Sequence, residues 1–130
     1  MIDEQYPADL RYHEEHDWAR LDGIEAEFGI TWFAQNEIGE LVFVDLPSHG
    51  TALVKDAPYA EVESVKAVSD VIAPLSGEVI AVNEDVVADP SLVNDDPYGR
   101  GWLVRVRLST PAEQTSLLDA SAYEAQLADA

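Results

Sequence analysis

Cysteine is absent from this 130-residue sequence, and lysine occurs only at positions 55 and 66. Without cysteine, the chain has no disulfide framework, no thiolate nucleophile and no cysteine-ligated zinc or iron-sulfur site. The sequence also lacks an apolar run of membrane-spanning length, and its acidic beginning, MIDEQYPADL, is typical neither of a secretory signal nor of an Arg-rich transit peptide. These absences predict a bacterial cytoplasmic protein, or a mitochondrial matrix protein whose targeting segment has been removed.

Basic residues are scarce. Lysine and arginine together number 7 against 26 aspartates and glutamates, which gives a formal net charge of −19. Phosphate backbones and anionic lipids repel so acidic a chain, so we expect neither nucleic acid nor a membrane among its partners. Basic protein surfaces are better candidates, although an acidic surface also serves solubility alone. The length predicts one domain, residues 1–130, with a single core.

Alternating apolar and polar residues predict several short strands. The period of two is clearest over 24–30 and 102–108, where one face of each segment is apolar. Short strands separated by turn residues favour a sandwich or a barrel. Four further strand-like segments lie at 41–46, 59–65, 68–74 and 78–83.

Helix signals are fewer. Thr31 and Gly39 mark the beginning and the end of a helix of about two turns. Ser or Thr followed three residues later by Glu, the capping-box spacing, occurs at 110–113 and 121–124 and predicts two short C-terminal helices. A single turn is also expected at 89–92, before a loop.

The sequence contains no recognisable catalytic motif. His13 and His16 lie among carboxylates, a pattern found in some metal sites, but His49, the third histidine, is far along the chain. Because an acid-flanked surface pair is more commonly just solvated, no metal is predicted. There is no Gly-x-Ser-x-Gly elbow and no phosphate-binding glycine loop, and no pair of carboxylates stands out for acid-base catalysis. No catalytic residue is therefore predicted.

Lys66 lies where two strand-like segments, EVESV and VSDVIAP, meet. That position predicts a hairpin tip, with the amine directed away from the sheet and within reach of another enzyme. A lysine on a rigid turn suits covalent attachment of a carrier group, because its flexible stem becomes the inner half of an arm. From spacing alone, an ordinary surface lysine beside Glu63 or Asp70 is the commoner explanation.

Four blocks of the sequence resemble one family. VESVKAVSD followed by APLSGEV is similar to the lipoyl-attachment segment of glycine cleavage H proteins. Three other blocks match the family in the same order: RYHEEHDWAR, GIT with AQNEIGELVFVDLP, and LVNDDPYGRGWLVRV. The resemblance extends from about Tyr6 to Leu127. A biotinyl carrier would have methionines beside the lysine, where this chain has Val65 and Ala67.

The resemblance implies a mainly β fold of the lipoyl/biotinyl type, a barrel-sandwich hybrid with a short internal helix and C-terminal helices. It implies a carrier that is not an enzyme, with lipoic acid in amide linkage on Lys66. The arm would accept an aminomethyl group from glycine decarboxylase (P protein), present it to the aminomethyltransferase (T protein) and be reoxidised by dihydrolipoamide dehydrogenase (L protein). A lipoate ligase or a lipoyl/octanoyl transferase would attach the cofactor, and the isolated chain is expected to be a monomer.

The resemblance also implies a cleft for the loaded arm. Two carboxylates of the family's cleft match Asp17, beside the tryptophan of the opening block, and Asp70, after the lysine. A cationic aminomethyl group is labile in water, so carboxylates in a cleft would hold it between encounters. Glu61 and Glu63 are suited to steering the chain onto basic enzyme surfaces, including that of the lipoylating enzyme. Solvated acids on an acidic surface are the simpler alternative for each.

Two other functions stay open at this point. A lipoyl relay protein serving 2-oxoacid dehydrogenase complexes would use the same Lys66 with different partners, and only tests of those partners separate it from the first function. An acidic enzyme or binding module would leave Lys66 inert, so modification of this lysine would exclude that class.

The cleft of this chain departs from the family pattern at two places. The opening block usually has glutamate where this chain has Asp17, so the carboxylate stands on a shorter stem. Where the family often has an acid and then a histidine, this chain has Trp32 and Phe33. An apolar wall would therefore replace the polar contact that a histidine makes to the arm.

We predict that the Phe33→His variant, once loaded, releases its aminomethyl group to water markedly more slowly than the parent chain, because the polar contact to the arm is restored. The decay of the loaded mass over time measures this rate. Attachment of the arm itself should be unaffected, and equal release rates in the two chains would refute the hypothesis.

Overall fold

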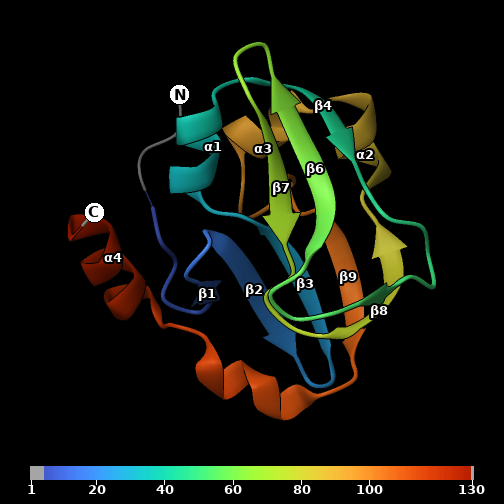
Figure 1. Cartoon of the computed structure of the whole chain (residues 1–130), viewed down its shortest axis with the longest axis vertical. Coiled ribbons are helices and arrows are strands. Elements are labelled where there is room, and N and C mark those ends of the chain that lie inside the picture. The colour runs from blue at the N-terminus through green and yellow to red at the C-terminus, as the bar shows by residue number, and fades with distance from the viewer. Residues whose placement is uncertain (1–4, 130) are drawn as a thin grey trace.

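The computed structural model describes residues 5–129, whose strands form two antiparallel sheets (Figure 1). The six-stranded sheet contains, in spatial order, β1 (Arg11–His13), β2 (Asp17–Asp22), β3 (Glu25–Ile30), β9 (Val104–Leu108), β8 (Gly77–Val82) and β5 (Ala52–Leu53). The three-stranded sheet contains β4 (Leu41–Asp45), β6 (Pro58–Ser64) and β7 (Val68–Ile72), in that order. The mainly β architecture expected from the alternating pattern is thus confirmed. The prediction about the acidic N-terminal segment falls partly on residues 1–4, which lie outside the described residues.

Short helices connect the strands of the described chain. They are α1 (Trp32–Ile38), α2 (Glu84–Ala88), α3 (Ser91–Asp95), the 3-10 helix η1 (Pro111–Ser116) and α4 (Ala120–Ala128). The predicted limits of α1 are confirmed, since the Thr31 side chain accepts the Ala34 N–H and Gly39, at φ 91°, ends the helix. None of the helices within 5–129 has the length and apolar character needed to cross a bilayer.

The two C-terminal helices form, but without the predicted capping boxes. Thr110 precedes η1 and makes no side-chain capping bond, while Glu113 accepts hydrogen bonds from the backbone N–H and the hydroxyl of Ser76 at 2.8 and 3.0 Å. Asp119 caps α4 by accepting a backbone N–H at 2.8 Å, which leaves Ser121 inside the helix. Tertiary partners and a better-placed carboxylate therefore outcompete the local pairs.

The strands β1, β2 and β5 were not predicted from the sequence, and β2 shows why. Asp17, Trp18 and Ala19 are consecutive and all buried, so the strand has no alternation at its start. Trp18 packs into an aromatic cluster, whereas Ala19 packs on the opposite side, into the core between the sheets. Ile24 was expected on the apolar face of its segment, but it lies in the turn before β3 and is 59% exposed.

The packing of α1 and α3 bears on the site. Their apolar residues join a cluster of buried side chains that also includes residues of β4, β6 and β7. Leu92 and Val93 of α3, Ala34 of α1 and Val62 of β6 belong to this cluster. The helices are thereby fixed against the three-stranded sheet that carries the hairpin of Lys66.

A close approach of Gly29 to Trp18 fixes the pairing of β2 with β3. The two residues are cross-strand partners, and a Cβ added at Gly29 would lie 2.5 Å from the buried indole ring. The indole N–H donates to the Pro97 carbonyl oxygen at 3.0 Å, so the ring is not free to move away.

We therefore expect Gly29→Ala to lower the free energy of unfolding by about 1–3 kcal/mol, the usual cost of overpacking a core. Urea denaturation of the variant and the parent chain measures the difference. In a Trp18→Leu background the same glycine substitution should cost much less, because the ring that it clashes with is gone. An equal cost in both backgrounds would argue against the clash.

Candidate functional site

Lys66 lies at the tip of the hairpin formed by β6 and β7, which projects at the top of Figure 1. Glu63 and Val68 are the last paired residues before the turn, and the Ser64 N–H donates to the Ala67 carbonyl oxygen at 2.8 Å. Lys66 is exposed, and none of the ion pairs found in the described chain involves it. The predicted hairpin tip is confirmed.

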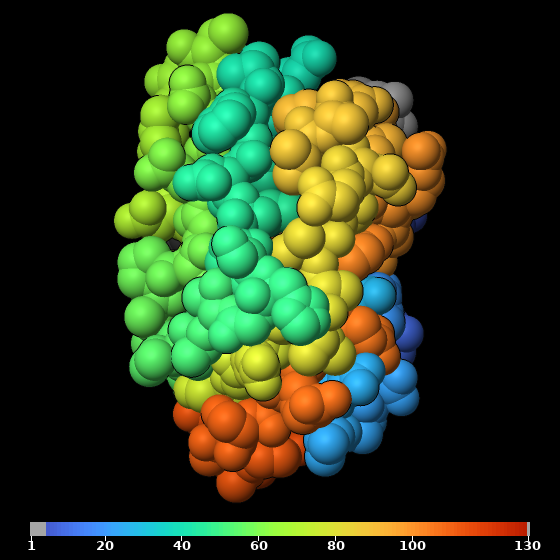
Figure 2. Space-filling model, turned by 90° about the vertical axis from the view of Figure 1, so that its right-hand side faces the viewer, coloured from blue at the N-terminus to red at the C-terminus, as the bar shows by residue number. Residues whose placement is uncertain are grey.

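The tip is braced against the end of α1. The Ser64 hydroxyl donates to the Ile38 carbonyl oxygen at 2.7 Å, and the same oxygen atom of Ser64 accepts the Lys66 N–H at 3.3 Å. Asn94 of α3 donates in turn to the Gly39 carbonyl oxygen at 2.9 Å. Figure 2 shows the hairpin, in yellow-green, projecting beside the teal residues of β4, its neighbour in the three-stranded sheet. The base of the lysine therefore has a fixed position.

A pocket of about 220 Å³ lies at α1, against β2 and β7, and we call it the arm cleft. Its carboxylates are Glu15, Asp17, Glu37 and Asp70, so the structure brings together both acids that the sequence singled out. The arm cleft is also lined by His16, Ser69 and the apolar side chains of Ile30, Phe33, Ala34, Ile38, Val62 and Val71. Because Ile38 also accepts the bond from Ser64, the cleft and the braced tip share the last turn of α1.

Asp17 is a buried acid, with a relative exposure of 2%. Burial raises its pKa well above the usual range and the charge of Glu15 raises it further, against a lowering by the hydrogen bond that it accepts from the Ile72 N–H. Within the described chain, its Oδ2 atom has no hydrogen-bond partner. The simple alternative of a solvated surface acid is therefore wrong for Asp17, while Asp70, on the edge strand β7, is exposed.

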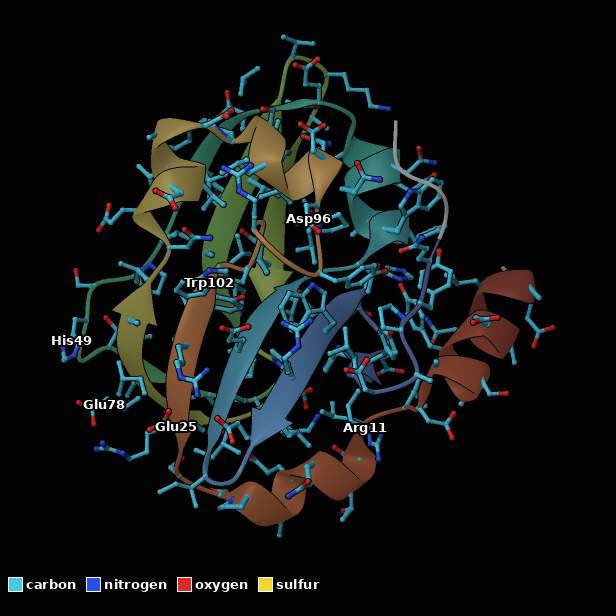
Figure 3. All side chains as sticks on the ribbon, turned by 180° about the vertical axis from the view of Figure 1, so that it is seen from behind. Arg11, Glu25, His49, Glu78, Asp96 and Trp102 are labelled. Carbon is cyan, nitrogen blue, oxygen red and sulfur yellow. The ribbon has the colours of Figure 1, made fainter. Side chains whose placement is uncertain are left out.

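His13 does not form a solvated pair with His16, contrary to expectation. It is buried, its Nε2 lies 2.7 Å from the Asp56 carboxylate, and its Nδ1 accepts the Glu15 N–H at 3.0 Å. His49 is exposed on the loop between β4 and β5, at the outer edge of the molecule in Figure 3. In the described part of the chain, no group of three or more His, Asp or Glu side chains is placed to hold a metal ion.

His16 is the cleft residue that sequence reasoning missed. Its ring lies against Phe33, with 4.6 Å between ring centroids, and its Nδ1 is 2.7 Å from the hydroxyl of Tyr123. Tyr123 belongs to α4, and 107 positions separate it from His16. No local pattern signals such a contact, which is why the pair of histidines indicated only a metal site or solvation.

The outer face of the three-stranded sheet combines carboxylates with exposed apolar side chains. Strand register places one row of three acids across it, Asp45, Glu61 and Asp70. The next row toward the tip is Phe43, Glu63 and Val68. Phe43 is 50% exposed and Val68 is 59% exposed, so this row presents apolar surface beside the acids.

Known proteins resemble this chain along nearly its whole length. A family model described as Glycine cleavage H-protein matches residues 10–130. A glycine cleavage system H protein of Symbiobacterium thermophilum is 50% identical over 119 residues, which are 92% of this chain and 93% of that protein. A probable glycine cleavage system H protein of Natronomonas pharaonis is 52% identical over 122 residues, 94% of this chain and 96% of that protein.

A solved structure shares the fold. The crystal structure of a glycine cleavage system H protein from Mycobacterium marinum matches with a TM-score of 0.86 and 39% identity, covering 94% of this chain and 98% of that chain. The predicted lipoyl/biotinyl-type barrel-sandwich hybrid is thereby confirmed. Sequence and structure agree over the same residues, and this chain therefore belongs to the glycine cleavage H-protein family.

Proposed function

We propose that this chain is the non-enzymatic lipoyl carrier of a glycine cleavage system and that the lipoyl group is attached to Lys66. The observation that carries the proposal is the exposed lysine on a braced hairpin tip beside a cleft of carboxylates. Lys55, the other lysine, has a side chain only 19% exposed and forms an ion pair with Asp56 at 2.9 Å. Lys66 is thus the more accessible amine and the one at a rigid projection.

When bound, the lipoyl group supplies a disulfide that is reduced as it takes up the aminomethyl group left from glycine after decarboxylation. The chain supplies placement. The hairpin holds the amine clear of the sheet, and the bond from Ser64 to α1 fixes the base of the arm, so the motion of the arm is confined to the lysine stem and the cofactor. A fixed base limits the region that the arm samples.

The arm cleft fits a primary ammonium group. Such a group has three N–H donors, and the unpartnered Oδ2 of Asp17 is a buried acceptor that gains a bond when a donor arrives. The nearby carboxylates of Asp70, Glu15 and Glu37 make the potential in the cleft negative. The apolar wall formed by Ile30, Val62 and Val71 limits the access of water and strengthens these interactions.

We propose as partners the P, T and L proteins and the enzyme that attaches the lipoyl group. The two rows of cross-strand neighbours that begin with Asp45 and Phe43 lie on the three-stranded sheet whose hairpin carries Lys66. Their carboxylates and exposed apolar side chains suit a partner surface that is basic with an apolar centre. A relay to 2-oxoacid dehydrogenases would use the same lysine, so exchange of the aminomethyl group with glycine decarboxylase is the test that separates the two.

Incubation with lipoate, ATP and a lipoate ligase is expected to add one lipoyl group to the parent chain, as read by intact mass. Lys66→Arg should gain nothing, because the only accessible amine on the hairpin is removed, whereas Lys55→Arg should be modified as the parent is. A lipoyl group on the Lys66→Arg chain would contradict the assignment. Failure of all chains under conditions that load a known carrier would contradict the proposed function itself.

Asp17→Asn is expected to stabilise the fold and to weaken retention of the cargo. A raised pKa means that the native carboxyl binds its proton more tightly than the unfolded one does. Its stabilising effect is therefore complete below the unfolded pKa, near 4, and is lost as the pH rises through the native pKa. The amide carries no charge, so the gain in free energy of unfolding should appear at pH 7 and be absent at pH 4.

The control for Asp17→Asn is Asp70→Asn, which removes the same charge from an exposed position. It should leave stability nearly unchanged, while both variants should release the aminomethyl group to water faster, by about tenfold for the buried position. Urea denaturation at the two pH values and the decay of the loaded mass provide the measurements. Unaltered release from Asp17→Asn would remove this residue from the proposed site.

A further inference from the structure

We propose that Tyr123 of the C-terminal helix holds His16 as a neutral imidazole with its proton on Nε2, so that the arm cleft contains an N–H donor and no histidine base. His16 is then a positioning and protecting residue of the cleft, and Tyr123 acts through it. This inference rests on the proposed function, because the cleft is the one to which we assign the aminomethyl group.

The donors and acceptors of Thr31, Tyr123 and His16 determine this tautomer. The Thr31 hydroxyl oxygen already accepts the Ala34 N–H at 3.2 Å, and Thr31 is fully buried. Its own proton therefore needs an acceptor, and the Tyr123 oxygen, at 2.8 Å, is the one within reach in the described chain. Tyr123 is then left with its proton for the Nδ1 of His16, at 2.7 Å. A neutral ring that accepts at Nδ1 carries its proton on Nε2.

The second nitrogen of His16 is open. Within residues 5–129, the buried side-chain nitrogen and oxygen atoms without a hydrogen-bond partner are the Oδ2 of Asp17 and the hydroxyl of Tyr59. Because Nε2 of His16 is not among them, this nitrogen is accessible from the cleft. The residue lines the cleft, its ring rests on Phe33, and its backbone is held in the left-handed region at φ 76°. The imidazole is thus clamped between α1 and α4.

Burial also keeps the ring neutral. It lowers the pKa of His16, as does the nearby His13, whereas the charges of Glu15 and Glu37 act in the opposite direction. The net lowering leaves the imidazole uncharged at neutral pH. The titratable groups around the ring come from β1, from the turn before β2, and from β2, α1, β7 and α4. They are His13, Glu15, Asp17, Glu37, Asp70 and Tyr123.

The alternative states of His16 would each harm the cargo. An imidazolium would repel a cationic aminomethyl group. A lone pair on Nε2 would act as a general base on water. The water oxygen would then bond to the methylene carbon as the carbon–sulfur bond breaks. Sulfur would keep that electron pair and take a proton, and the aminomethanol so formed would separate into formaldehyde and ammonium. The Nε2–H tautomer has no net charge that would repel the cargo and no lone pair on Nε2 that would activate water.

The first experiment reads the tautomer by ¹⁵N NMR of the imidazole nitrogens, in the chain without a lipoyl group. The parent chain is expected to carry the His16 proton on Nε2, and Tyr123→Phe, which lacks the donor to Nδ1, should shift the ring toward a mixture. The matched control is Tyr12→Phe. Its ring stacks on Tyr123 at 4.9 Å, but its hydroxyl donates to the Pro7 carbonyl oxygen, so it should leave the tautomer as in the parent.

The second experiment follows release of the aminomethyl group to water from lipoylated, loaded chains between pH 5 and 8, a range that includes the lowered titration of His16. Tyr123→Phe should release it about fivefold faster, with a rate that rises through the histidine titration, as general-base catalysis requires. Adding His16→Gln to Tyr123→Phe should remove the pH-dependent part, and Tyr12→Phe should match the parent.

The two experiments fail in different ways. A proton on Nδ1 in the parent chain, or an unchanged tautomer in Tyr123→Phe, would overturn the assignment. An altered tautomer with an unaltered release rate would overturn the protecting role. A chain that cannot be lipoylated at Lys66 would remove the proposed function and the protecting role with it, while the NMR result on the unmodified chain would still decide the state of His16.

Discussion

The buried carboxyl group of Asp17 lies where the two sheets of the molecule meet, and the backbone amide of Ile72 acts on its pKa from the other sheet. Ile72 ends β7, the edge strand of the three-stranded sheet, and Asp17 begins β2 of the larger sheet. A buried carboxyl group is costly unless donors reach its oxygens, and within the described chain the Oδ2 atom of Asp17 has no hydrogen-bond partner. The unpartnered acceptor of the arm cleft follows from this placement.

The hairpin and the cleft are separate parts with one common support. Ser64 ties the hairpin tip to the carbonyl oxygen of Ile38, and the side chain of Ile38 lines the cleft. The exposed lysine and the partly enclosed cleft therefore have a fixed relative position, set by a single short helix. That helix is fixed in turn by Asn94, which donates to the Gly39 carbonyl oxygen and belongs to α3.

Much of the fold was predictable because its strands alternate and its turns carry turn residues. The hairpin of Lys66 and the limits of α1 depend on such local signals, and the structure bears them out. The burial of Asp17, the partner of Glu113 and the contact of His16 with Tyr123 depend on residues far apart in the sequence. A single sequence contains no local trace of these contacts. Of the residues involved, the resemblance to a family pointed only to Asp17, as an acid of the cleft.

The row formed by Asp45, Glu61 and Asp70 has a kinetic consequence. Aligned like charges on an open sheet attract a basic partner over the screening length of about 8 Å at physiological ionic strength. Such steering raises the rate of encounter more than the strength of the final complex. The carrier that we propose would visit several enzymes in turn and would need fast arrival without long residence, and a row of carboxylates on the sheet next to Lys66 suits that combination.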